Sequence, residues 1–172
     1  MIRIGILGNI GSGKSYVANN LGYPVFDADY EVAILYKKNR KIFLRLKKIL
    51  PNNIKTFPIE KKEIIEAILE KKNNLKQIIK IVHIEIRKKL NLFLKKNNKK
   101  KYVILDIPLF FENKLNRKND IIIFVHANKN LIKKKLKERN GFDENLINLL
   151  KKIQLPLHVK RKKSHFIIKN NF

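Results

Sequence analysis

The sequence of 172 residues contains no cysteine and no tryptophan, and its 14 acidic residues are few beside 40 basic ones. Without cysteine the chain cannot form disulfides, thiolate zinc sites or a cysteine nucleophile, and this fits a reducing compartment. No apolar run approaches the roughly 18 residues that a membrane-spanning helix needs. The first residues also lack the basic start and cleavage site of a signal peptide. We therefore expect a soluble, cytoplasmic protein.

The formal net charge of +26 would ordinarily indicate nucleic acid or an anionic membrane surface as the partner. Here the cations are mostly lysine, and lysine, asparagine and isoleucine are enriched together along the whole chain, as an AT-rich coding sequence would produce. RNA contact would favour arginine and interleaved aromatic residues. We expect most of the lysine runs, at 99–101, 133–135 and 160–163, to form solvated surface, with no specific nucleic acid or membrane partner.

Short apolar runs alternate with longer amphipathic segments, in a chain whose length suits one domain. Strands are predicted at residues 2–7, 23–26, 102–106, 121–125 and 166–168. Helices are predicted at residues 14–21, 32–50, 60–69, 75–94, 131–139 and 144–153. Strands that alternate with helices in this way predict an α/β fold of three layers, with a parallel sheet in the middle and an inserted helical block between the second and third strands.

The segment Gly8-Asn9-Ile10-Gly11-Ser12-Gly13-Lys14-Ser15 matches the pattern G-x-x-x-x-G-K-[ST] and follows an apolar strand at the start of a helix. Its glycines let successive backbone N–H groups face a polyphosphate at the positive end of the helix. We expect Lys14 to reach the β- and γ-phosphates and the Ser15 hydroxyl to bind Mg²⁺. A chance glycine turn is the alternative, which the strand-loop-helix context disfavours.

A phosphate loop alone does not distinguish a GTPase, a motor ATPase and a kinase. The sequence has no Asn-Lys-x-Asp segment for guanine and no Thr-rich switch followed by Asp-x-x-Gly. Its length leaves little room for the extra strands of a motor ATPase. A small-molecule kinase remains, with ATP as the expected co-substrate.

Acidic residues end two of the predicted strands, where the carboxyl ends of parallel strands form a ligand site. A kinase needs a group that orients and deprotonates the acceptor hydroxyl. Asp27 and Asp29 would point to one side if the extended geometry continues that far. Asp29 is the better candidate, while helix capping is an alternative role for Asp27. Asp106 is expected to hold Mg²⁺ directly or through water.

An apolar segment follows Asp106 at once. Pro108 and Phe111 are expected to line a pocket for the acceptor, although core packing would explain Phe110 and Phe111 equally well.

Taken in order, these motifs resemble those of the dephospho-CoA kinase family, which phosphorylates the ribose 3′-hydroxyl of dephospho-CoA. The resemblance covers nearly the whole chain. The matching stretches are 4–15, 25–29 and 105–112, with Asp120, Arg139, Gln154 and 166–171. The Asp-Ala-Asp and Pro-Leu-Phe-Phe-Glu segments discriminate, because many families share the phosphate loop.

The resemblance implies one P-loop kinase domain with a core at about 1–29, 100–128 and 164–172, an acceptor-binding helical insertion at about 30–99 and a lid at about 129–163. It implies that Asp29 acts on the 3′-hydroxyl and that Arg139 of the lid holds phosphates or neutralises the transferring charge. His83 would take an acceptor-facing or structural role. The implied cofactors are ATP and Mg²⁺, the implied partner is dephospho-CoA, and we expect a monomer.

The sequence also departs from the family pattern. Asn9 stands in place of a glycine, and Tyr16 in place of a small hydroxyl residue beside the nucleotide. Lys135 replaces an arginine of the lid, which keeps the charge but loses the bidentate fork. No segment corresponds to the family's final helix. These differences put efficiency in doubt more than identity.

Two alternatives stay open. A nucleoside or nucleotide monophosphate kinase would share the fold, but such enzymes carry several arginines for the acceptor phosphate, and this chain has few. A basic nucleic-acid-binding protein with a relic phosphate loop would bind RNA with a steep salt dependence. The intact Gly13-Lys14-Ser15 disfavours that alternative.

Overall fold

The computed structural model describes residues 1–138 and 142–171. The chain divides into two compact units, Met1–Ala28 with Leu94–Phe172, and Asp29–Phe93. Within the described part of the chain, no helix has both the length and the apolar composition to cross a membrane.

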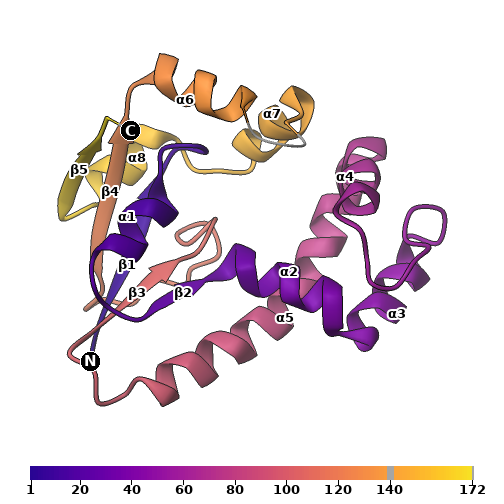
Figure 1. Cartoon of the computed structure of the whole chain (residues 1–172), viewed down its shortest axis with the longest axis horizontal. Helices are drawn as coiled ribbons and strands as arrows, with labels where there is room; N and C mark the ends of the chain where they lie inside the picture. Colours follow the sequence, from indigo (N-terminus) through magenta and orange to yellow (C-terminus); the bar gives the residue numbers. More distant parts are fainter. Residues whose placement is uncertain (139–141, 172) are drawn as a thin grey trace. The chain divides into compact units, whose positions relative to one another are not determined.

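The first unit contains one sheet whose strands all run parallel (Figure 1). Its strands are β1 (Ile2–Gly8), β2 (Val25–Asp27), β3 (Tyr102–Asp106), β4 (Ile121–Ala127) and β5 (Phe166–Asn170). Their order in the sheet is β2-β3-β1-β4-β5, so β1 lies between the two strands that follow the helical block. The parallel α/β fold predicted from the sequence is confirmed.

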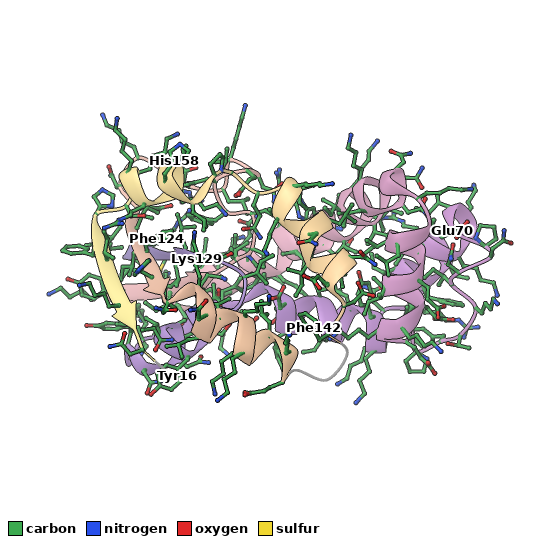
Figure 2. All side chains as sticks on the ribbon, turned by 90° about the horizontal axis from the view of Figure 1, so that it is seen from above. Tyr16, Glu70, Phe124, Lys129, Phe142 and His158 are labelled. Carbon is green, nitrogen blue, oxygen red and sulfur yellow. The ribbon has the colours of Figure 1, made fainter. Side chains whose placement is uncertain are left out.

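The helices of this unit are α1 (Lys14–Asn20), α6 (Lys129–Lys137), α7 (Glu144–Lys152) and α8 (Leu157–Lys162). Figure 2 shows α1 and α8 on opposite sides of the sheet, which gives the predicted layers. The sequence prediction missed α8. Its six residues are too few for an amphipathic period to stand out, and they begin directly after Pro156, the residue that precedes the first helical turn.

The three central strands, β1, β3 and β4, are buried along most of their length, as expected for apolar runs in a parallel sheet, whereas the edge strand β5 is largely exposed. One core cluster joins β1, β3 and β4 to α1 through Ile4, Ile6, Val17, Ala18, Ile104, Ile123 and Val125. On β1, a Cβ at Gly5 would lie 2.7 Å from the ring of Phe110, which is fully buried. Core packing therefore accounts for Phe110.

The second unit is helical. It contains α2 (Ala28–Lys38) from Asp29 onward, α3 (Arg40–Ile49), α4 (Lys61–Glu70) and α5 (Lys72–Lys96) as far as Phe93. The prediction of one helix over 32–50 is wrong. Asn39 is in an extended conformation and its side chain accepts a hydrogen bond from the Ile42 N–H, so it ends one helix and caps the next.

Most residues of the three lysine runs are exposed, as predicted, but Lys160 is an exception. It is 3% exposed, and its Nζ lies 2.8 Å from Oε1 of Glu112. A buried lysine is stable only beside an anion, and sequence reasoning gave no hint of this partner.

Candidate active site

The phosphate loop joins β1 to α1 and takes backbone conformations that glycine permits. Gly11 and Gly13 have φ angles of 80° and 83°, in the left-handed region. A Cβ at Gly11 would lie 2.9 Å from the side chain of Leu136. Leu136 and Ile132 of α6 form a small apolar cluster with Ala127, and Ile10 of the loop packs against it. The loop is thus held against α6 as well as against its own helix.

Within the loop, the Lys14 Nζ donates a hydrogen bond of 2.8 Å to the Asn9 carbonyl. The lysine therefore folds back over the loop, where its charge is placed for an anion bound by the loop's N–H groups. Asn9 also accepts a hydrogen bond at its side-chain oxygen from the Ile10 N–H. This local bond suits the residue to a position where a glycine was expected.

The Ser15 hydroxyl and the Asp106 carboxylate meet at the carboxyl end of the sheet. Ser15 Oγ donates to Asp106 Oδ2 at 2.5 Å. Burial raises the pKa of Asp106, and the negative charge of Asp27 raises it further, while the hydrogen bond from Ser15 and the charge of Lys14 act to lower it. The net effect is a raised pKa of Asp106, so a cation bound beside this carboxylate would stabilise its charged form.

Asp27 lies closer to this group than the sequence indicated. It ends β2, and the parallel register aligns it with Asp106 at the end of β3. Asp29 lies in the first turn of α2 and is exposed. The extended geometry on which the placement of Asp27 and Asp29 on one side depended does not continue to Asp29, because the strand ends at Asp27 and the helix starts at Ala28. The sequence alone did not predict this neighbour, because Asp27 comes to lie beside Asp106 through the pairing of β2 with β3.

The last strand also reaches the loop. Asn170 at the end of β5 donates from Nδ2 to the Ser12 carbonyl at 3.1 Å. Ser12 is fully buried. Sequence reasoning included Asn170 only as part of a matching stretch, and the motif gave no sign of this contact.

The other residues that the sequence predicted for the nucleotide and acceptor sites lie on separate elements of the fold. Pro108 and Phe111 are partly buried in the segment after β3. Tyr16 is 67% exposed on α1, at the lower edge of Figure 2. His83 is partly buried on α5, in the helical unit, and its pKa is lowered by burial and by the neighbouring Arg87. Arg139 lies outside the described residues.

A cavity of about 530 Å³ adjoins the loop at Asn9. The first residue of α6, Lys129, and Phe142 before α7 both line it, and both are labelled in Figure 2. Lys133 and Lys137 follow Lys129 at four-residue intervals on the same face of α6. The turn between α7 and α8 also contributes Gln154, Leu155 and Pro156 to the lining. The lining of the cavity is therefore partly apolar and includes several lysines.

A glycine loop between a central parallel strand and a helix, with its serine bonded to an aspartate at the end of the neighbouring strand, defines a P-loop nucleotide-binding fold. The family model described as dephospho-CoA kinase matches residues 2–172. The chain belongs to the dephospho-CoA kinase family, and the family and enzyme class inferred from the motifs are confirmed.

Individual proteins that are similar to this chain support the same family assignment. The dephospho-CoA kinase of Wolbachia pipientis wMel is 37% identical over 170 residues, which cover 96% of this chain and 87% of that protein. The crystal structure of TT1252 from Thermus thermophilus is similar with a TM-score of 0.75 at 28% identity, covering 99% of this chain and 89% of that one. Dephospho-CoA kinase from Campylobacter jejuni gives a TM-score of 0.62 at 26% identity, covering 98% and 88%.

Proposed function

We propose that this chain transfers the γ-phosphate of ATP to the ribose 3′-hydroxyl of dephospho-CoA, giving coenzyme A and ADP. One observation carries the proposal: the phosphate loop and the Ser15–Asp106 pair lie at the same end of the sheet, in a chain that belongs to this family over residues 2–172. The proposed partner is thus a small molecule, and we propose that the enzyme acts as a monomer in the cytoplasm.

The loop Gly8–Ser15 would hold the triphosphate through its backbone N–H groups. Lys14 would exchange the Asn9 carbonyl for a phosphate oxygen, because a charge-assisted bond to an anion is stronger than one to a neutral carbonyl. Tyr16 lies next to the loop on the exposed side of α1 and would flank the nucleotide.

The donor types at Ser15 and Asp106 fit Mg²⁺. A hydroxyl and a carboxylate oxygen are hard ligands, and Mg²⁺ in kinases uses one or two protein ligands together with substrate phosphates and water. Among the described residues no group of three or more acidic or histidine side chains could hold a metal alone. The ion would neutralise charge that develops on the phosphates during transfer. Ser15 and Asp106 would position it, and Asp27 would add negative charge nearby.

For the acceptor, we propose that Asp29 orients the 3′-hydroxyl and accepts its proton as the oxygen attacks the γ-phosphorus. Its exposure on the first turn of α2 leaves the carboxylate accessible to a ligand. The helical insertion, about 30–99, would bind the rest of the acceptor, with His83 facing it. Pro108 and Phe111 would contact it from the segment that follows Asp106, the last residue of β3.

Residues of about 129–163 would form the lid, with Arg139 at the transferring phosphate. Lys129, Lys133 and Lys137 support a cationic role for this segment, since they line the cavity beside Asn9. Excluding water there would suppress hydrolysis of ATP.

The test is a coupled ADP-release assay with Mg-ATP, with and without dephospho-CoA. Acceptor-dependent release in the wild type, lost by roughly a hundredfold or more in Asp29→Asn, would support both the acceptor and the base. The matched control is Glu70→Gln, an exposed carboxylate at the end of α4, which should keep wild-type turnover. ATP binding with no acceptor-dependent turnover would overturn the proposed acceptor.

A further inference from the structure

Glu112 and Lys160 form a buried ion pair that none of the proposed catalytic roles uses. The Nζ–Oε1 distance is 2.8 Å, and the side chains of Lys160 and Glu112 are 4% and 11% exposed. Lysine is rarely buried in proteins, and Lys160 differs in this respect from most of the many cations that give the chain its net charge of +26.

The same carboxylate also holds the backbone of the turn between α7 and α8. Glu112 Oε1 accepts a hydrogen bond of 2.8 Å from the Leu155 N–H. Lys160 Nζ in turn donates to Gln154 Oε1 at 3.2 Å. One glutamate after β3 therefore fixes both a backbone group of the turn and a side chain of the helix that follows it.

A second contact joins the same two segments. Lys163, which follows α8, places its Nζ 6.0 Å from the centre of the Phe111 ring, at the outer limit for a cation–π contact. The segment that carries Phe111 and Glu112 begins at Asp106, whose carboxylate accepts the hydrogen bond from Ser15. A short stretch of chain thus connects the proposed metal ligand to the α7–α8 turn.

That turn is a wall of the cavity beside the phosphate loop. Gln154 and Leu155, the two residues bound by the pair, line the cavity together with Asn9 of the loop and Lys133 of α6. The position of the turn therefore sets the distance between this wall and the loop.

Stability gives little reason for a charged pair here. Removing two charges from water costs free energy that their attraction repays only in good geometry, and well-packed apolar residues often stabilise a protein as much or more. We infer that Glu112 and Lys160 are positioning residues, which hold the α7–α8 turn at the distance from the phosphate loop that ATP binding and transfer require. This inference rests on the proposed kinase function.

Two variants separate positioning from simple stability. Glu112→Asp keeps both charges but shortens the side chain, so it cannot reach Lys160 and the Leu155 N–H without moving the turn. The double variant Glu112→Gln/Lys160→Met removes both charges together and leaves an acceptor for the Leu155 N–H. Neither variant leaves a lone buried charge, so both are expected to fold, with a melting temperature close to that of the wild type.

The experiment measures kcat and KM for each substrate, together with the Kd for ATP by calorimetry, on full-length enzyme. In both variants we expect kcat/KM for ATP to fall by about fivefold or more, a change of about 1 kcal/mol. The Kd for ATP should rise in parallel, while KM for dephospho-CoA stays within about twofold. The pair Glu85–Lys88 on α5 has the same 2.8 Å distance and an exposed lysine, and it provides the matched controls Glu85→Asp and Glu85→Gln/Lys88→Met, which should leave the Kd for ATP unchanged.

Wild-type kcat/KM and Kd for ATP in folded Glu112→Asp would overturn the inference. Wild-type kcat/KM and Kd for ATP in the folded double variant would overturn it as well. If the wild type binds ATP but does not turn over dephospho-CoA, the proposed acceptor fails, and the Kd for ATP in the same variants still decides the role of the pair.

Discussion

The Ser15 hydroxyl donates to the Asp106 carboxylate at 2.5 Å, although 91 positions separate the two residues in the sequence. The contact exists because β1 pairs with β3 in parallel, which brings the start of α1 next to the end of β3. A desolvated carboxylate beside a second acid is an arrangement that favours function over stability.

Asp106→Asn is therefore expected to stabilise the nucleotide-free protein at neutral pH while reducing turnover by about a hundredfold or more. The substitution removes a carboxylate whose pKa is raised by burial and by Asp27, and it keeps an oxygen that can accept from Ser15. Thermal melting and the ADP-release assay measure the two effects. A variant with wild-type turnover would exclude Asp106 from the site.

The stabilising effect of Asp106→Asn should depend on pH. Because the folded-state pKa of Asp106 is raised above its usual value of 3.8, its contribution to stability is fully present below that value and is lost as pH rises through the folded pKa. The stability advantage of Asp106→Asn should therefore grow from acid towards neutral pH. An advantage that shrinks over this range would contradict the upward shift.

Asn170→Ala should weaken ATP binding by up to about tenfold and lower the free energy of unfolding by about 1.5 kcal/mol or less. The variant removes the hydrogen bond to the Ser12 carbonyl, and a net hydrogen bond contributes about 0.5–1.5 kcal/mol. Calorimetric titration with ATP measures the change. Asn20→Ala is the control, since Asn20 makes a similar 2.8 Å bond to the Tyr16 carbonyl at an exposed site. Equal effects of the two substitutions would show that the contact with Ser12 does not order the loop.

Arg3→Met should lower the free energy of unfolding by about 3–5 kcal/mol, because it leaves a buried carboxylate without its cation. Arg3 Nη2 lies 2.7 Å from Asp120 Oδ2, with both side chains almost fully buried. Denaturant unfolding measures the loss. Lys62→Met, at an exposed pair with Glu66 separated by 3.8 Å, should cost less than about 1 kcal/mol. Similar losses in the two variants would contradict the importance of burial.

The lowered pKa of His83 predicts a pH dependence of stability opposite in sign to that expected for Asp106. Burial and Arg87 lower its pKa below the usual 6.5, so its contribution to stability is present above that value and is lost as pH falls through the folded pKa. His83→Gln should therefore reduce the loss of thermal stability on mild acidification. Arg87→Gln should reduce it in part, because one of the two causes is removed. Melting curves between about pH 7.5 and about pH 5 test both variants.

Local sequence patterns were sufficient to predict the phosphate loop and the strands of this protein. The phosphate loop is contiguous, and the glycines, Lys14 and Ser15 carry their chemistry wherever a strand precedes them and a helix follows. The apolar strands were likewise predictable, because burial on both faces needs unbroken apolar runs. The break at Asn39 left a local signal as well, since asparagine is a favoured cap, but the helical period continued across it.

Only the tertiary structure decided which distant residues meet. Strand order placed Asp27 beside Asp106, and the end of β5 placed Asn170 on Ser12. The burial of Lys160 is the clearest case. In the sequence it is one lysine in a basic run, and it becomes a buried cation because the chain after β3 places Glu112 against it. Periodicity and composition describe each segment by itself, whereas such contacts depend on how segments pack, which is why the sequence alone determined the loop and the strands but not these pairs.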